Sequence, residues 1–387
     1  MINFTYHNPV KIVFGKGTIA ELKDLAPSGG KVMLLYGGGS IKKNGVYDQI
    51  RSALSGFDVT EFGGIEPNPR YETCMRAAAQ ARKEQAVFLL AAGGGSVMDA
   101  AKFIAVAALY DEGGDPWEIM EHRRPVTAAL PVGTVVTLPG TGSEMNSFSV
   151  ISRESSGEKL AFGSPHCYPR FSILDPETTF SIPVRQVENG IVDTFAHVME
   201  QYMCAVGSAP LTERQAEALL MTVIAEAPKI KACPKDYDVR ANLMWCATLA
   251  LNGSLGCGVE TEDWSSHMLG HELTARYGLD HARTLAVMMP AVHRHQIKRK
   301  MPRLVQCAER VWGITAINDA VRADKAVDRM EEFFRQTGMS TRLYEYQIDA
   351  EEAAGIAAER ISQRGVMLGE HGDLGAKEIR EIFMLAK

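Results

Sequence analysis

Short apolar runs alternate with amphipathic stretches through the first half of the chain. Each run ends in glycine or other turn residues, a pattern that is typical of buried strands. The stretches between the runs carry apolar residues at helical spacing. The predicted strands are residues 31–36, 58–62, 86–92 and 128–138, and the predicted helices are residues 46–55, 71–84 and 97–109. Strands that alternate with helices predict a parallel sheet with helices on both faces.

The pattern changes after about residue 180. Residues 176–183 are rich in turn and capping residues, and strand-like alternation is scarce beyond them. A chain of 387 residues is long enough for two cores. We therefore expect an α/β domain over residues 1–180 and an all-helical domain over residues 181–387. The predicted helices of the second domain are residues 184–206, 211–230, 237–252, 262–277 and 282–300, with more toward the C-terminus.

Composition and charge exclude several classes of protein. A net charge of −6 argues against a nucleic-acid or anionic-membrane partner, since either would need a basic face. The 7 cysteines contain no Cys-x-x-Cys pair, which argues against a disulfide framework and fits a reducing compartment. The N-terminal segment lacks the pattern of a signal peptide, and no apolar run approaches the roughly 18–20 residues of a membrane span. We expect a soluble cytoplasmic protein.

Three turns follow predicted strands. The sequence Gly-Gly-Gly-Ser occurs at residues 37–40 and again at residues 93–96, and a third turn spans residues 139–144. Glycine lets a phosphate approach unpaired backbone N–H groups where a helix begins. Neither Gly-Gly-Gly-Ser loop matches G-x-G-x-x-G, and a single loop of this kind is often only a tight connection. Three loops at the carboxyl ends of parallel strands together predict a nucleotide site.

The first loop indicates which nucleotide binds. It continues into Lys42 and Lys43 and contains a hydroxyl at Ser40 but no acid. An NAD site commonly offers a carboxylate to the ribose hydroxyls, whereas the 2′-phosphate of NADP favours cations. The loop therefore favours NADP(H). The alternative is that both lysines belong to an ordinary solvated surface.

Histidines cluster in one short segment. His267, His271 and His281 lie within 15 positions of a chain that has 10 histidines, and Asp193 precedes His197 by four residues. Residues at i and i+4 are neighbours on a helix, with Cβ atoms roughly 5–6 Å apart. One such pair is more often an ion pair or a core histidine, but both pairs together predict a zinc or iron site. Five candidates exceed the three or four protein ligands of such a site, and spacing does not choose between His271 and His281.

Several motifs follow one another in an order shared with a known family. They are Gly93-Gly-Gly-Ser96-x-x-Asp99-x-x-Lys102, Pro139-x-Thr141-Gly-Ser-Glu144, Asp193-x-x-x-His197, His267-x-x-x-His271 and Gly278-x-x-His281. Together they resemble the iron-containing (group III) alcohol dehydrogenases over essentially the whole chain. The chain is most similar to the branch of butanol dehydrogenases and NADPH-dependent aldehyde reductases. The resemblance implies a Rossmann-like dinucleotide-binding domain, an all-helical metal-binding domain, and a homodimer.

The resemblance also implies roles for individual residues. The metal ligands would be Asp193, His197, His267 and His281, while His271 would lie near the nicotinamide and the substrate. Many family members that use NAD carry an aspartate where this chain has Gly39, and the difference favours NADP(H). The metal would be iron or zinc, because this ligand set suits both. The cofactor contacts would be Gly38, Gly39, Ser40, Gly94, Gly95, Ser96, Asp99, Thr137, Thr141 and Lys159.

The sequence therefore predicts an NADP(H)-dependent alcohol dehydrogenase or aldehyde reductase that contains a metal ion. Its substrates would be short- to medium-chain aldehydes and primary alcohols, with His271 as the candidate proton relay. Three alternatives stay open at this point. A glycerol dehydrogenase or a dehydroquinate synthase would have the same architecture, although no basic cluster for a phosphorylated substrate lies near the histidines. A metal hydrolase would leave the glycine loops purely structural, and an inactive binding module would not need a complete ligand set.

Overall fold

The computed structural model describes residues 1–111, 113–205, 207, 209–315 and 318–387. The chain forms two compact units, and neither is one continuous stretch. The α/β unit consists of His7–Pro183 and Pro234–Asn252, and the helical unit consists of Met1–Tyr6, Val184–Cys233 and Gly253–Lys387. The change of unit after Pro183 lies close to the expected boundary at residues 180 and 181. The return of residues 234–252 to the α/β unit was not expected from the sequence.

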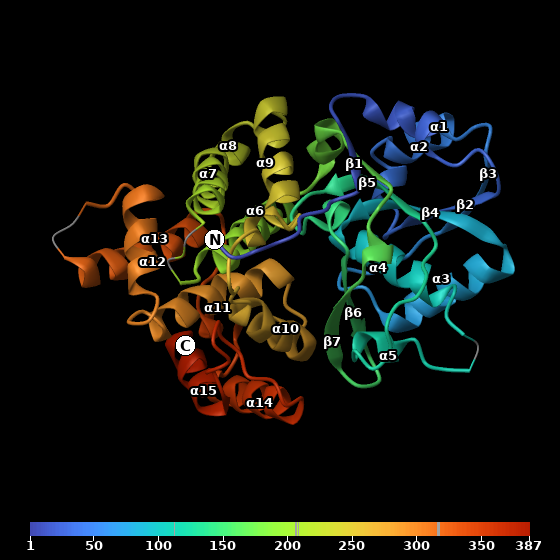
Figure 1. Ribbon diagram of the computed structural model, residues 1–387. Coiled ribbons are helices and arrows are strands. Elements are labelled where there is room, and N and C mark those ends of the chain that lie inside the picture. Colours follow the sequence, from blue (N-terminus) through green and yellow to red (C-terminus); the bar gives the residue numbers. More distant parts are fainter. Residues whose placement is uncertain (112, 206, 208, 316–317) are drawn as a thin grey trace. The chain divides into compact units, whose positions relative to one another are not determined.

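A six-stranded sheet forms the centre of the α/β unit, and all its strands are parallel, as the alternating pattern predicts. The strand order is β1-β8-β5-β4-β2-β3 (Figure 1). The strands β2 and β3 coincide with the predicted ranges, β4 extends two residues beyond its range, and β5 begins four residues after the predicted start. The bounds are β1 Lys11–Phe14, β2 Lys31–Tyr36, β3 Asp58–Phe62, β4 Ala86–Gly94, β5 Val132–Leu138 and β8 Phe171–Leu174.

Alternate residues of the central strands build a core on each face of the sheet. In β2, Met33 and Leu35 pack with residues of α3 and α4, while Val32 and Leu34 pack with residues of α1 and α2. All four side chains are fully buried, and burying each contributes roughly 1.5–3 kcal/mol to folding. Both faces are therefore covered, and the binding chemistry is left to the strand ends. The helices of this unit are α1 Leu22–Leu25, α2 Val46–Ala53, α3 Tyr71–Lys83, α4 Gly95–Ala107, α5 Trp117–Met120 and α9 Tyr237–Ala250.

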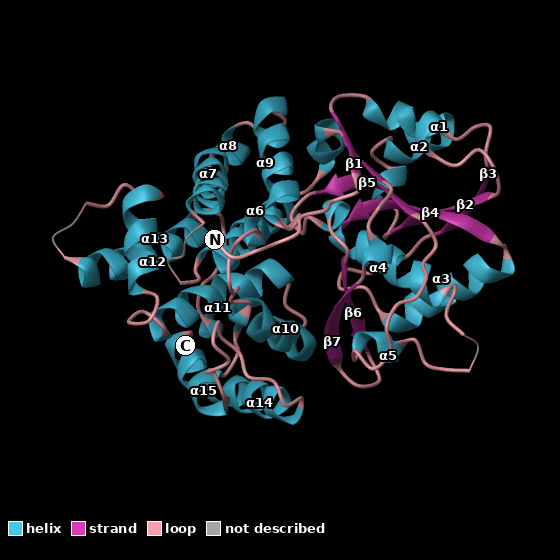
Figure 2. Cartoon of the chain, in the orientation of Figure 1, coloured by secondary structure: helices cyan, strands magenta, loops and turns pink. Residues whose placement is uncertain are grey.

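The sequence pattern did not indicate four of the eight strands that the described residues form. The strands β1 and β8 have only four residues each, too few to show a periodicity. The other two, β6 (Phe148–Arg153) and β7 (Glu158–Gly163), form a separate antiparallel hairpin. Figure 2 shows the strands of the α/β unit in magenta. The hairpin matters for the site because β6 provides a backbone donor to Asp99, as described below.

Helix α9 packs against the α/β unit, although its sequence suggested a place in the all-helical domain. The Thr248 hydroxyl donates a hydrogen bond of 2.6 Å to Oε1 of Glu144, and both residues are buried. Met244 packs into the same apolar core as α3 and α4. Trp245 meets Phe14 edge to face, with ring centroids 5.8 Å apart. These specific contacts decide the position of α9, and helical periodicity carries no information about them.

The helical unit contains helices only, apart from an isolated bridge between Leu368 and Leu374, within its described residues. One core is built from α10, α11, α14 and α15, and Figure 1 shows α14 and α15 in red at the end of the chain. No helix among the described residues is both long and apolar enough for a membrane span. The bounds are α6 Val184–Tyr202, α7 Pro210–Glu226, α8 Lys229–Ala232, α10 Ser265–Tyr277, α11 His281–His295, α12 Met301–Arg310, α13 Asp319–Gln336, α14 Ala350–Gln363 and α15 Ala376–Leu385.

Candidate metal site and cofactor loops

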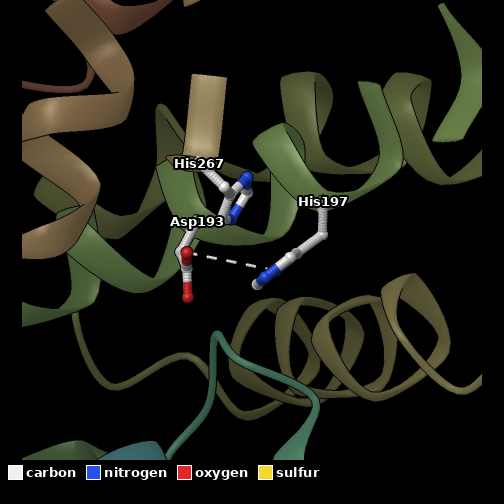
Figure 3. Close-up of side chains that lie close together, drawn as sticks. All are labelled: Asp193, His197 and His267. Carbon is white, nitrogen blue, oxygen red and sulfur yellow. Dashed lines mark ion pairs between the residues drawn. The ribbon is translucent and has the colours of Figure 1, made fainter. Parts of the chain in front are cut away.

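Two helices of the helical unit bring three of the predicted ligands together. Asp193 and His197 lie one turn apart on α6, and His267 lies in the first turn of α10. All three side chains are buried, and one ligand atom from each lies within 4.8 Å of the others. The distance from Nδ1 of His197 to Oδ1 of Asp193 is 4.0 Å. Figure 3 shows the three side chains converging from the two helices.

His281 and His271 lie beside this group. His281 is the first residue of α11, and its Nε2 lies 3.6 Å from Oδ1 of Asp193. Its ring centroid is 5.0 Å from that of His267. The His271 ring is 5.2 Å from that of His281 and 6.4 Å from that of His267. All five candidates therefore gather in one place, where His271 and His281 are half-buried and the other three are buried.

The residues present fit a divalent cation. Oδ1 of Asp193 is buried and accepts no hydrogen bond from any described residue, which is costly for a carboxylate oxygen without a cation. Ring nitrogens of His281 and His197 lie 3.6 and 4.0 Å from this oxygen, and a mixed set of nitrogen and carboxylate oxygen ligands suits zinc or iron. The same set is what the sequence motifs predicted. The choice of ligand residues remains a prediction, with Asp193, His197 and His267 the best supported by geometry.

A short turn places His281. Gly278 ends α10 in the left-handed conformation with φ +69°, which a side chain would disfavour. Asp280 then accepts hydrogen bonds from Nη2 of Arg185 at 2.9 Å and from Nδ2 of Asn189 at 3.1 Å. Burial alone would raise the pKa of Asp280, but these two donors outweigh burial and hold it below its ordinary value. The start of α11 is thereby tied to the start of α6, the helix that carries Asp193.

Glu200 is a residue of the site that the sequence interpretation missed. It follows His197 by three residues on α6 and is almost fully buried. Its Oε1 accepts hydrogen bonds from the backbone N–H groups of Ser266 at 2.7 Å and His267 at 3.2 Å, and its Oε2 contacts Nδ1 of His267. Burial and the neighbouring Asp263 raise the pKa of Glu200, and the two backbone donors oppose that rise. The spacing 193, 197, 200 places all three residues on one helix face and could have revealed it.

A buried ion pair lies on the far side of Glu200. The backbone N–H of Asp263 donates to the Glu200 carbonyl at 3.3 Å, and Oδ2 of Asp263 lies 2.7 Å from Nζ of Lys300. Burial alone would raise the pKa of Asp263, but the Lys300 ammonium holds it below its ordinary value. Lys300 also donates to the Met203 carbonyl at 2.6 Å. The charge of Asp263 is thus compensated within the protein.

The glycine loops of the α/β unit pack closely against one another. The strand β4 runs directly into α4 between Gly94 and Gly95, without an intervening loop. A Cβ on Gly95 would overlap the Thr141 side chain of the third turn, and one on Gly37 would lie 3.7 Å from Val97 of α4. The three loops therefore meet at the carboxyl ends of β2, β4 and β5, which are neighbours in the sheet. This is where an open parallel sheet binds its ligands.

Beneath the second and third loops lies a buried polar cluster around Lys102. Nζ of Lys102 donates to the Ser143 hydroxyl at 2.8 Å, to Oδ1 of Asn146 at 2.9 Å and to the Phe148 carbonyl at 2.7 Å. The Ser143 hydroxyl donates in turn to Oδ1 of Asp99 at 2.6 Å. Burial lowers the pKa of Lys102 to about 8, and the Asp99 charge opposes this shift. We call these residues, Asp99, Lys102, Ser143, Asn146 and Phe148, the Lys102 cluster.

Asp99 was predicted as a cofactor contact, and the structure shows what else it does. Its Oδ1 accepts from Ser143, and its Oδ2 accepts from the backbone N–H of Val150 in β6 at 3.0 Å. Burial raises the pKa of Asp99, and the Lys102 ammonium opposes that rise. Both carboxylate oxygens thus accept from protein donors that shape the third turn. A direct contact between Asp99 and a cofactor stays a prediction.

The remaining predicted cofactor contacts lie around the same strand ends. Gly39 is in the left-handed conformation with φ +87°, and open space lies where its Cβ would be. Nζ of Lys159 donates to Oδ1 of Asn68 at 3.0 Å, so Asn68 is a further polar residue at this edge. Lys42 lies 3.4 Å from Oε2 of Glu61 at the end of β3. The sequence interpretation overlooked Glu61 because it considered only the acids within the loop.

Two family models together match almost the whole chain. The model described as iron-containing alcohol dehydrogenase matches residues 9–176, and the C-terminal model of the same family matches residues 188–386. The chain belongs to the iron-containing alcohol dehydrogenase family. The resemblance of its motifs is therefore confirmed, and so is the predicted combination of a parallel sheet with a helical C-terminal part.

Family members from several bacteria are similar over nine tenths or more of their length. NADPH-dependent aldehyde reductase YqhD of Escherichia coli is 48% identical over 100% of both chains. A crystal structure of E. coli YqhD has a TM-score of 0.97 and covers 100% of this chain and 99% of that one. A probable NADH-dependent butanol dehydrogenase of Bacillus subtilis is 42% identical over 92% of this chain and 93% of its own. The structure of an NADH-dependent butanol dehydrogenase from Thermotoga maritima is 34% identical, with a TM-score of 0.94 over 99% and 98% of the two chains.

Proposed function

We propose that this chain reduces short- to medium-chain aldehydes to primary alcohols, and catalyses the reverse reaction, with NADP(H) and one divalent metal ion. The observation that carries the proposal is the convergence of Asp193, His197 and His267 in a member of the iron-containing alcohol dehydrogenase family. The names of the relatives, an NADPH-dependent aldehyde reductase and several butanol dehydrogenases, support the class of substrate. Either iron or zinc is compatible with the donor set.

The loop after β2 supports NADP(H) over NAD(H). Relatives use both cofactors according to their names, so the choice rests on this chain's own residues. Gly39 leaves open space beside an exposed Ser40 and an exposed Lys43, which suits a 2′-phosphate. Glu61 also lies near, but Lys42 and the Tyr47 hydroxyl, at 3.4 and 2.5 Å, compensate its charge. Of the two lysines, Lys43 is therefore the stronger candidate for the phosphate.

The protein's own residues have distinct parts in the reaction. Asp193, His197, His267 and His281 would hold the ion, and the burial of the first three keeps water away from their ligand atoms. When bound, the ion supplies Lewis acidity toward the substrate oxygen, and the nicotinamide supplies the hydride. The half-buried His271 lies one turn after His267 on α10 and donates, from a ring N–H, the proton that the reduced oxygen requires. The three glycine loops bind and orient the diphosphate through their backbone N–H groups.

The proposal extends to location and assembly. All 7 cysteines lie in the described part of the chain and none forms a disulfide bond, in keeping with a cytoplasmic enzyme. A homodimer is proposed from the family resemblance. Sedimentation of the purified protein would test it, because a monomer at micromolar concentration would contradict the expectation.

The test of the function is the initial rate of NADPH oxidation with butanal. Three preparations are compared: the protein as purified, after treatment with a chelator, and after reloading with zinc or ferrous iron. NADH serves as the parallel donor. We expect activity that requires metal and prefers NADPH. Metal-dependent activity that prefers NADH would overturn the cofactor proposal alone, and no reduction of any aldehyde by any form would overturn the function.

A further inference from the structure

A buried carboxylate lies directly behind one of the proposed metal ligands. The Glu200 side chain is 1% exposed and contacts three nitrogen atoms in the first turn of α10. Two are the backbone N–H groups of Ser266 and His267, and the third belongs to the His267 ring at Nδ1. The carboxylate therefore contacts both the backbone and the side chain of the same residue.

The backbone contacts explain why α10 begins where it does. The first N–H groups of a helix have no partner within the helix, and a carboxylate there also interacts favourably with the helix dipole. The N-cap residue, Trp264, has no side-chain acceptor that could bond to these groups. Glu200 of α6 provides the acceptor instead and joins the two helices at the point where both carry proposed ligands.

The ring contact has a further consequence for His267. An imidazole that donates Nδ1–H to a carboxylate carries its proton on Nδ1, so its lone pair is on Nε2. Because this lone pair is the one a cation can bind, the contact selects the tautomer that is competent for metal binding. It also fixes the rotation of the ring, since the carboxylate is itself held by two backbone donors.

We propose that Glu200 is a positioning residue that holds His267 in the tautomer and orientation needed for metal binding. The inference rests on the metal site of the proposed function. Other buried carboxylates of the helical unit differ from Glu200 in their partners. Asp263 is paired with Lys300 at 2.7 Å, and Glu217 is paired with Arg310 at 3.1 Å. Glu200, among the described residues, has an ion-pair contact with His267 alone.

This difference argues against a purely structural role. A carboxylate that only stabilised the fold would be expected to have a cation of its own, because an uncompensated buried charge costs several kcal/mol. The charge of Glu200 instead faces a ligand of the proposed divalent ion. A carboxylate behind a metal-bound histidine raises the basicity of the imidazole and typically changes metal affinity or activity by about 10–100-fold.

The decisive experiment measures metal affinity in Glu200→Gln, Glu200→Asp and Glu217→Gln. An amide at position 200 cannot satisfy all three N–H groups. If the amide NH₂ faces Nδ1, Nδ1 must accept a hydrogen bond, so the His267 proton moves to Nε2. If the amide oxygen faces Nδ1 instead, the NH₂ faces the two backbone N–H groups, which then have no acceptor. Glu217→Gln is the matched control, because Glu217 is a buried carboxylate of the same unit whose contacts are with Tyr202, Gln306 and arginines.

Two readouts separate positioning from folding. The dissociation constant for Zn²⁺ is measured by competition with a chromogenic chelator, and the His267 tautomer is measured from the ¹⁵N shifts of labelled histidine in the metal-free protein. We expect Glu200→Gln to weaken Zn²⁺ binding by about 10–100-fold and to move the His267 proton from Nδ1. Glu200→Asp should recover part of the affinity because it retains the charge, and Glu217→Gln should bind Zn²⁺ like the wild type.

The outcomes that would overturn the inference are specific. One is that Glu200→Gln binds Zn²⁺ as tightly as the wild type. The other is that Glu200→Gln and Glu217→Gln lose Zn²⁺ affinity equally, which would indicate a general effect on folding. Circular dichroism of each variant checks that the helices are intact. The result is independent of turnover. Wild-type protein that binds Zn²⁺ but reduces no aldehyde would contradict the proposed function while leaving the role of Glu200 intact.

Discussion

The two units bury charged groups in opposite ways. In the α/β unit, the Lys102 cluster is internally complete: the ammonium has three acceptors at 2.7–2.9 Å, and both oxygens of Asp99 accept hydrogen bonds. In the helical unit, Oδ1 of Asp193 accepts no hydrogen bond from the described residues, although ring nitrogens of His197 and His281 lie 4.0 and 3.6 Å from it. The first cluster is satisfied without any ligand, whereas the second has the composition of a site that a cation completes.

The contrast shows that the residues of a sequence motif can have either of two roles, a structural one or a chemical one. Asp99 and Lys102 belong to a family motif just as Asp193 and His197 do, yet in the structure the first pair forms hydrogen bonds that shape the loops proposed to bind the cofactor. We infer that the Lys102 cluster determines stability and the metal cluster determines chemistry. The four predictions below test that separation, beginning with the largest expected effect.

Asp193→Ala should abolish metal binding while leaving the fold intact. The substitution removes the one proposed carboxylate ligand, and Lewis-acid assistance is worth several kcal/mol of barrier, so aldehyde reduction should fall by roughly 10³-fold or more. Metal content per chain and kcat are the measurements, with exposed Asp324→Ala of the same unit as the control. A variant that retained its metal would show that Asp193 is not a ligand.

Lys102→Met should have the opposite effect: it should lower stability and leave metal binding intact. Without Nζ of Lys102, three acceptors each lose a donor and Asp99 loses its nearby compensating charge, so the free energy of unfolding should fall by about 3 kcal/mol. Metal bound per folded chain should stay unchanged. Urea denaturation measures the first quantity and metal analysis the second, with exposed Lys83→Met as the control. Loss of metal without loss of stability would reverse our assignment of the two clusters.

His271→Ala should slow turnover without emptying the metal site. A proton relay typically contributes about 10²-fold or more to the rate, and His271 lies beside the ligand group, outside the three closest side chains. Both kcat and metal content are measured, and added imidazole should restore part of kcat. If the metal were lost instead, His271 would be a ligand and the distinction between His271 and His281 would have to be reversed.

The stability gap between wild type and Lys102→Met should widen as the pH rises above 8. Lys102 has a pKa of about 8 in the folded protein, below the ordinary lysine pKa of 10.5, so over this interval the unfolded chain binds more protons. The free energy of unfolding of the wild type therefore rises with pH. Between about pH 7.5 and about pH 9.5, its difference from that of Lys102→Met should grow by about 2 kcal/mol. Urea denaturation at both pH values measures the gap. A gap that stayed constant would mean that Lys102 remains charged when buried, and a gap that narrowed would mean that its pKa is raised on folding.

The central part of the fold could be predicted because its signals are local. The strands at residues 31–36, 58–62 and 86–94 are long enough to show their period, and each is followed by turn residues. The strand β8 has only four residues, so neither its length nor its periodicity could reveal it in the sequence. Helix α9 was recognised as a helix, but the contacts that assign it to the α/β unit, such as Thr248 with Glu144, span 104 positions.

The candidate metal ligands could be predicted from the sequence, but the residues that contact them could not. The i,i+4 pairs identified Asp193, His197 and the His267 segment, which the structure brings together. Glu200 was missed because a glutamate three residues after a histidine is ordinary on a helix, and only the contact with His267 distinguishes it. In the same way, Glu61 lies 19 positions from Lys42 in sequence, and no pattern within the loop reveals its carboxylate.

The discontinuous α/β unit has a consequence for the order in which the protein is made. The ribosome completes all six strands of the sheet before it begins α9, yet Glu144 is buried in the finished unit against a hydroxyl that is synthesised 104 residues later. During this interval the nascent sheet must keep an unpaired carboxylate and an apolar face next to water. This surface is covered only when α9 docks, so the α/β unit cannot reach its final packing until residue 250 has been synthesised.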